Sequence, residues 1–287
     1  MSAALRVEAL AGSALYQDVG RGHVASGVPV GGAFDRFAHE AATRLVGGTP
    51  ADATIEVTGT LVLSTPVRLT CALAGSAALL VDGRQAPAWT ALDVRAGARI
   101  EVAATGRGYL AIAGGLHPEP VLGSRSTCLM GPVGPAPIRV GDTLPLGPFW
   151  TADTVGDVVG RLPQTDQVRV VPGPHLALPA GPVSVVDVSR IGIRLRPTSE
   201  VAAAASLPSL GVLPGAIQVV PSGEWIALGP DAGTMGGYPV IGVVVSADVD
   251  RLAHVVPGQV LHLLPVAAGD APRPVAPRVL RLGAVRG

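Results

Sequence analysis

Lysine is absent from this sequence of 287 residues, so all 21 of its basic residues are arginine. The chain therefore cannot form a catalytic Schiff base on a lysine, and it has no phosphate-loop lysine. Any cationic role must fall to arginine, whose guanidinium suits carboxylates and phosphates because it forms paired hydrogen bonds with them.

Cysteine, net charge and long apolar runs are also missing or scarce. Cys71 and Cys128 are the only cysteines, and they show neither metal-ligand spacing nor the density of a disulfide scaffold. Acidic and basic residues balance at 21 each, which leaves no net charge to attract nucleic acid or an anionic membrane. No run reaches the roughly 18 apolar residues of a membrane span, and Arg6 and Glu8 interrupt the place where a signal peptide needs its apolar core. We expect a reduced, cytoplasmic protein.

Glycine and proline are abundant, at 38 and 27 residues, and 48% of the chain is apolar. Short β-branched runs bounded by glycine or proline recur along the whole length, which is typical of barrels or sandwiches. The expected strands include 61–63, 79–81, 100–102, 109–113, 168–171, 183–188, 216–220, 240–245 and 260–264.

A turn followed by a strand occurs three times, as RAGARIEV at Arg95, RVGDTLPL at Arg139 and VPGQVLHL at Val256. The repetition indicates two related β units, which we place at residues 1–160 and 161–287. Three short matches fit chance hairpins equally well.

Two short helices are expected. Asp35 can cap a helix over residues 36–46 that ends at Gly47 and Gly48. A second helix over residues 247–253, with Ser246 as its cap, should follow a buried strand directly.

Two glycine-bearing loops are candidates for chemistry. The stretch GPDAGTMGGYPVIGVVV from Gly229 combines Asp231 and Thr234 with Gly236, Gly237 and Tyr238, and glycines allow a ligand to approach backbone amides. A tight hairpin explains it equally well. The loop GHVASGVPVGGAFD over residues 22–35 is better explained as a turn into the first helix, since no phosphate-loop pattern follows.

Arginine also appears in two candidate anion sites. GSRST places Arg125 beside Ser124 and other hydroxyls, and SRIGIRLRP places Arg190 and Arg194 on one face of a strand. By residue type alone, a surface turn and solvated strand arginines are the commoner explanations. The six histidines show no metal-binding spacing, so we expect no metal site.

Several of these segments form an ordered set of motifs. They are GVPVGGAFDRFAHEAATRLVGG at Gly27, IEVT at Ile55, AIAGGL at Ala111, LGSRSTCL at Leu122, RIGIRL at Arg190, PGAIQVVPSGEWIAL at Pro214 and GGYPVIGVV at Gly236. In this order they resemble the family that comprises the C subunit of 5-oxoprolinase and the second subunit of allophanate hydrolase, related to the carboxyltransferase half of urea carboxylase.

The resemblance implies a mainly β protein with two cyclophilin-like β-barrel halves. It also implies a cytoplasmic complex with a KipI-like B subunit, and with a LamB/YcsF-like A subunit, that opens 5-oxoproline to glutamate in an ATP-dependent hydrolysis. ATP need not bind this chain. Two alternatives stay open: a non-catalytic regulatory subunit, and a component of a biotin-dependent urea or amide carboxyltransferase, although this chain has no lysine to carry biotin.

The resemblance also suggests roles for individual residues. Arg125 and Arg194 would hold a substrate carboxylate, Asp231 or Asp35 would handle protons, and the Gly236 and Gly237 amides would polarise a carbonyl oxygen. Tyr238 is a third catalytic candidate; Ser124, Arg190, Gln218 and Thr234 complete the substrate-binding set. We place Arg125 and Asp231 in one cleft. Gly31, Ala136, Leu210, Gly233 and Met235 stand where the family tends to have polar residues, which favours the non-catalytic alternative.

Overall fold

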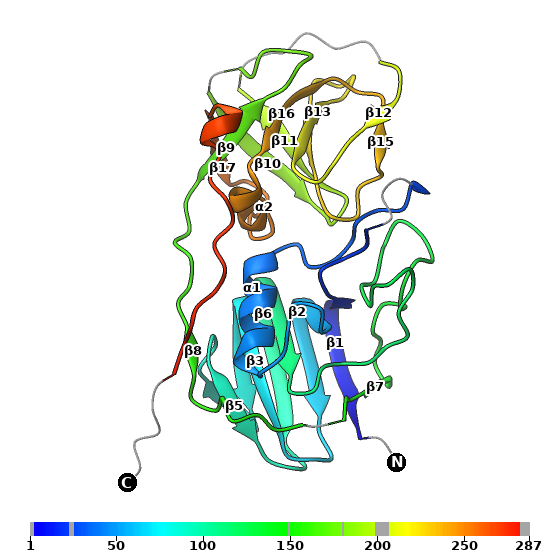
Figure 1. Cartoon of the computed structure of the whole chain (residues 1–287), viewed down its shortest axis with the longest axis vertical. Helices are drawn as coiled ribbons and strands as arrows, with labels where there is room; N and C mark the ends of the chain where they lie inside the picture. The colour runs from blue at the N-terminus through cyan, green and yellow to red at the C-terminus, as the bar shows by residue number, and fades with distance from the viewer. Residues whose placement is uncertain (1–2, 23–25, 149, 180, 199–206, 282–287) are drawn as a thin grey trace.

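The computed structural model describes residues 3–22, 26–148, 150–179, 181–198 and 207–281. Part of the first glycine loop, residues 23–25, lies outside them. The chain folds into two β structures with two short helices at their junction (Figure 1). The mainly β prediction with two short helices is therefore confirmed.

The first half is a seven-stranded sheet in the order β4-β3-β6-β2-β1-β7, with β5 paired to β3. Its strands are β1 (Ala4–Gln17), β2 (Thr54–Ser64), β3 (Leu69–Val81), β4 (Arg84–Ala86), β5 (Ala91–Val94), β6 (Arg99–Ile112) and β7 (Thr143–Pro145). Gly12 pairs with Gly59 across β1 and β2. A Cβ on Gly12 would lie 2.1 Å from the Thr58 carbonyl oxygen, so the two backbones approach more closely here than other residues allow.

Apolar residues cover both faces of this sheet. One face packs into a core that includes Leu5, Leu63, Leu73 and Ile100. The other face packs against α1 (Arg36–Leu45) through Phe37, Ala41 and Leu45. Because these helix residues recur at three- and four-residue spacing, they form one apolar stripe that lies on the sheet.

The second half contains a closed barrel with the strand order β10-β11-β14-β13-β16-β9-β17. These strands are β9 (Gln167–Pro172), β10 (Pro182–Val188), β11 (Gly192–Pro197), β13 (Ala216–Val219), β14 (Trp225–Leu228), β16 (Val240–Val244) and β17 (Val260–Pro265). Only β9 and β17 pair in parallel. Of the two barrel halves that the resemblance implies, only this one forms a closed barrel among the described residues, whereas the first half is a sheet with β4 and β7 at its edges.

The remaining elements are short. They are β8 (Val158–Val159), β12 (Leu210–Gly211), β15 (Met235–Gly236), α2 (Ser246–Leu252), the 3₁₀ turn η2 (Ala268–Asp270) and β18 (Val279–Leu280). Strands β12 and β15 pair with each other, as do β8 and β18. Neither α-helix of the described residues is long and apolar enough to cross a membrane.

The cap expected for the second helix was wrong. Ser246 is already helical, and Val245 occupies the N-cap position without a side-chain hydrogen bond. The helix follows β16 directly, so the buried, extended Val245 is the last residue before it. By contrast, Asp35 caps α1 as expected, since its side chain accepts a hydrogen bond from the Ala38 amide.

Candidate active site between the two halves

A buried network of charges joins the two halves. Arg190, in the turn between β10 and β11, donates from Nη1 to both carboxylate oxygens of Glu56 on β2, at 2.8 Å each. Its Nε and Nη2 atoms donate to Asp231, in the loop after β14, at 2.9 Å each. Side-chain exposure is 2% or less for all three residues. Because each charge faces an opposite charge at hydrogen-bonding distance, the network can be buried without leaving an unpaired ion.

The pKa values within this network follow from its contacts. Burial raises the pKa of Glu56, but the charges of Arg190 and Arg107 outweigh burial and hold it at about 2. Burial raises the pKa of Tyr109 well above its ordinary value, and the Glu56 charge raises it further. Tyr109 therefore stays protonated. It donates to Glu56 at 2.9 Å and accepts from the Asp35 amide at 2.8 Å, which connects the network to the start of α1.

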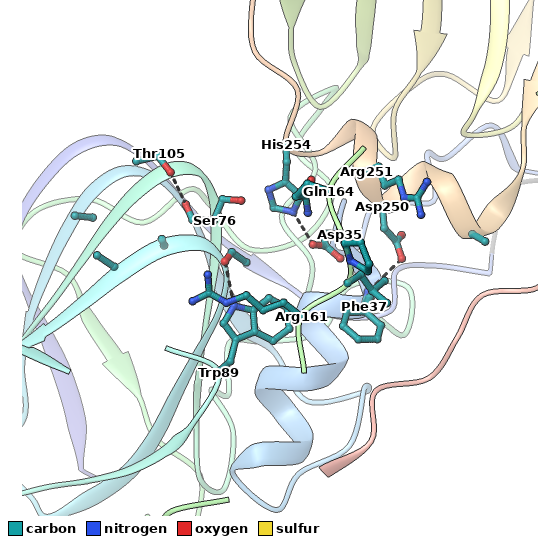
Figure 2. A pocket seen from close by; sticks show the side chains of 17 residues that line it. Asp35, Phe37, Ser76, Trp89, Thr105, Arg161, Gln164, Asp250, Arg251 and His254 are labelled. Atoms are coloured by element: carbon teal, nitrogen blue, oxygen red, sulfur yellow. Dashed lines mark hydrogen bonds and ion pairs between the residues drawn. The ribbon is translucent and has the colours of Figure 1, made fainter. Parts of the chain in front are cut away.

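The start of α1 borders a cavity of about 400 Å³ between the halves (Figure 2). Asp35 Oδ2 lies 2.6 Å from His254 Nε2, just beyond α2, while Asp35 Oδ1 accepts from the Ala38 amide. The carboxylate is thus fixed by its own helix and holds the imidazole in one orientation. A carboxylate and an imidazole in direct contact can share and transfer a proton.

Asp250 of α2 is a second carboxyl group in this cavity. It contacts Arg36 Nε at 3.2 Å and the Phe37 amide at 3.3 Å. Burial, together with the nearby Asp35 carboxylate, raises the pKa of Asp250 to about 6. A carboxyl group with such a pKa exchanges protons close to neutral pH, as a general acid or base requires.

The opposite wall of the cavity carries Trp89 and Arg161. The Arg161 guanidinium lies over the Trp89 ring, 5.8 Å from its centroid, and Trp89 is held by a hydrogen bond from Nε1 to the Gly75 carbonyl at 3.3 Å. Figure 2 shows the Arg161 side chain extended over Trp89, with its guanidinium on the side away from Asp35 and Asp250. The space can therefore accept a small molecule with both polar and flat apolar surfaces.

Of the residues proposed from the sequence, Asp35 lines the cavity, while Asp231 and Arg190 belong to the buried network. Ser124 lies beyond that network and donates from Oγ to Asp18 at 2.7 Å. The Arg125 amide donates to the same carboxylate at 2.6 Å. The loop that carries Arg125 reaches Asp231 through the Leu129 amide, at 3.2 Å. A substrate cleft shared by Arg125 and Asp231 stays a prediction, and the complete burial of Asp231 favours a structural role.

The other predicted residues lie elsewhere. Gly236 and Tyr238 line a separate cavity of about 210 Å³ with His175, and Gln218 lies beside them, since it donates to the Tyr238 carbonyl at 3.5 Å. The remaining predicted residues are Thr234, Gly237 and Arg194. Thr234 and Gly237 belong to the same loop, and their backbone carbonyls accept from the amides of Val212 and Leu207. Arg194 is half exposed on the barrel and pairs with Glu224.

His254 and Asp250 were missed by the sequence analysis. Asp250 lies within the predicted second helix, and His254 is one of the six histidines without metal-binding spacing. No local pattern marks either, because their partners Asp35 and Phe37 lie more than 200 positions earlier in the chain. Among the described residues, no three His, Cys, Asp or Glu side chains are grouped as metal ligands.

Comparison with known proteins agrees with this architecture. Residues 26–265 match the family model described as "Carboxyltransferase domain, subdomain A and B". The chain is 34% identical over 281 residues to the C subunit of 5-oxoprolinase from Escherichia coli, covering 89% of each chain. The crystal structure of TTHA0988 superposes with a TM-score of 0.84 at 31% identity, covering 91% of this chain and 56% of the other. The urea amidolyase of K. lactis shares the fold, with a TM-score of 0.84 at 23% identity, covering 94% of this chain and 19% of that much longer one.

Proposed function

The chain belongs to the carboxyltransferase subdomain A and B family, and from this premise we propose that it is one subunit of a 5-oxoprolinase-type complex. In this complex, ATP hydrolysis would drive the opening of 5-oxoproline to glutamate. The likeness to a 5-oxoprolinase subunit over 89% of both chains supports the choice of reaction. The arrangement of Asp35, His254 and Asp250 in one cavity supports a direct part in it.

We assign the proton transfers to the cavity between the halves. Opening a lactam requires that a proton be supplied to the departing ring nitrogen and removed from attacking water. Asp250, with its pKa of about 6, is suited to supply a proton. Asp35, held by Ala38 and His254, is suited to accept one.

ATP is assigned to the complex and not to this chain alone. The chain has no lysine, and among the described residues lining the cavity only Arg161, Arg251 and His254 are basic side chains. Arg251 is already paired with Asp248 at 3.3 Å. Arg161 is therefore the cavity residue best placed to contact a phosphate, which ATP would present from a partner protein. An amide carbonyl becomes reactive only when charge on its oxygen is stabilised, which phosphorylation can achieve.

A second candidate function is amide carboxylation, which the family description itself favours. A partner would have to carry biotin, because this chain has no lysine to which it could be attached. Exposed Leu210 and Met235, at 47% and 59%, favour a third function. These residues lie on the paired strands β12 and β15 and would suit a protein that mainly binds its partners.

The proposal is tested by reconstituting the chain with its KipI-like and LamB/YcsF-like partners and measuring ADP and glutamate release from 5-oxoproline. We expect His254→Gln to reduce turnover by roughly 10²–10⁴-fold, which is typical of a lost acid–base contribution. His262→Gln is the matched control, because His262 is half exposed on the barrel, 3.7 Å from Asp166, and should leave turnover unchanged.

Two outcomes would contradict the proposal. A correctly assembled complex that releases no glutamate would exclude 5-oxoprolinase activity, and carboxylation of an amide by a biotin-bearing partner would then support the second candidate. Equal losses in the His254 and His262 variants would exclude a specific role for His254.

A further inference from the structure

A second cavity, of about 360 Å³, also lies between the halves. Thr105 lines both cavities. A Cβ on Gly106, which lines the second cavity, would lie 3.3 Å from His254 Nδ1. The two cavities therefore adjoin at Thr105 and Gly106, and the hydroxyl residues Ser13, Thr58 and Ser189 also line the second cavity.

Arg107 lines this cavity, and its guanidinium has a hydrogen-bond donor that no described residue accepts from. Its side chain is 9% exposed, and Nη1 donates to Glu56 at 2.9 Å. Nε is buried and has no hydrogen-bond partner among the described residues. The guanidinium lies 5.2 Å from the centroid of the Phe34 ring. A buried donor without a partner is costly, so a site that retains one is poised to receive an acceptor.

Arg107 and Arg190 are the two cations that line the cavity, and Glu56 is its one lining carboxylate. Asp231 lies behind the lining and pairs with Arg190, so the group of four is neutral overall. Arg190 has no donor to spare, since Glu56, Asp231 and the Gly32 carbonyl take its hydrogen bonds. Of the two cations, only Arg107 therefore has a donor without a partner among the described residues.

We infer that the second cavity binds small carboxylates, with the free N–H groups of Arg107 as the principal donors. A carboxylate suits this position because two oxygens can accept from adjacent N–H groups of one guanidinium. The hydroxyls of Ser13 and Thr58 would supply further donors from the side of β1 and β2. The cavity volume falls within the range of small-molecule sites. The inference concerns binding alone and does not depend on the proposed reaction.

Calorimetric titration of the purified full-length chain, without ATP or partner proteins, tests this site. We expect 5-oxoproline to bind, acetate to compete with it, and the uncharged lactam 2-pyrrolidone to do neither. Arg107→Gln should weaken 5-oxoproline binding by roughly tenfold to a hundredfold. Arg95→Gln is the matched control, because Arg95 is 80% exposed and pairs with Asp82, and should bind as the wild type does.

Thr58→Ala and Ser13→Ala provide an independent measurement, because both leave the Arg107–Glu56 pair intact. Each should weaken binding by about two- to tenfold. A folded Arg107→Gln chain with unchanged affinity, equally tight binding of 2-pyrrolidone, or no saturable carboxylate binding by the wild type would each overturn the inference. Because no turnover is measured, an inactive complex would leave these results standing.

Discussion

The Glu56 carboxylate is a shared acceptor for groups from both halves. It receives hydrogen bonds from Arg107, Tyr109 and Arg190 and from the Phe34 amide. Glu56→Gln would keep the shape of the side chain but leave two buried guanidinium groups without their common anion. We expect the free energy of unfolding at neutral pH to fall by about 3–5 kcal/mol in denaturant titrations. Glu101→Gln, which breaks a more exposed pair with Arg99, should cost less than about 1 kcal/mol.

Glu56 also determines how the free energy of unfolding depends on pH in acid. The pKa of Glu56 is about 2 in the folded chain, against an ordinary value of 4.5. A lowered pKa means that the folded state binds this proton less tightly than the unfolded state does. Its stabilising contribution is therefore complete above pH 4.5 and is lost as the pH falls toward 2. In Glu56→Gln, the free energy of unfolding should change less between pH 4.5 and pH 2 than in the wild type. An equal change in the two proteins would contradict the lowered pKa of Glu56.

At the scale of elements, Asp35 serves both α1 and the cavity, and two substitutions separate these roles. Asp35→Asn keeps an oxygen that can accept from the Ala38 amide, but it loses the charge that faces His254. We expect unfolding free energy within about 1 kcal/mol of wild type and turnover of the reconstituted complex lower by roughly 10²-fold or more. Asp35→Ala should lower both stability and turnover. Wild-type turnover in the Asn variant would show that Asp35 acts only as a cap.

The two helices show what the sequence can predict at this scale. The signals for α1 are local: Asp35 supplies the cap, and Gly47 adopts a positive φ of 75° just after the helix. The start of α2 depends instead on where the preceding barrel strand ends, which no nearby residue specifies. The second half closes into a barrel and the first half does not. This difference likewise depends on pairings between distant strands, such as β9 with β17.

Sequence motifs selected Asp35, Arg190 and Asp231 as candidate site residues, but they neither placed these residues at the junction of the halves nor assigned their partners. Arg190 falls in a motif for which a solvated strand was the commoner explanation, yet it is 3% exposed. Arg190 can be buried because Glu56 neutralises its charge in the folded chain, and the local sequence does not show this because Glu56 lies 134 positions away. Only the contact with Asp35 marks His254 as a candidate for proton transfer.

At the scale of the whole molecule, Arg190 couples the barrel to the first half. Figure 1 shows the two halves stacked, with α2 between them and one end of α1 facing α2. Arg190→Met would remove the Arg190–Glu56 ion pair, one of the charged contacts that cross this junction, and would leave Asp231 buried without its cation. In scanning calorimetry we expect a lower unfolding temperature and separate transitions for the two halves. Arg194→Met, four residues later on the barrel surface, is the matched control and should keep the wild-type transition, since its pair with Glu224 is exposed.

A single transition of unchanged temperature in Arg190→Met would show that the Arg190–Glu56 pair is not needed to join the halves. Both Arg190→Met and Arg194→Met remove one positive charge, from positions four residues apart in the chain. Any difference between them therefore reports the junction and not the net charge.

The pairing of β18 with β8 bears on how the protein forms during its synthesis. Val279 and Leu280 leave the barrel and return to the first half, where Val279 also packs against the apolar cluster under α1. Domains generally fold as they emerge from the ribosome, N-terminal first. Here the first half receives one of its strands from residues translated after the entire barrel. The cluster under α1 therefore lacks Val279, and β8 lacks its partner strand, until the residues that follow the barrel have been translated.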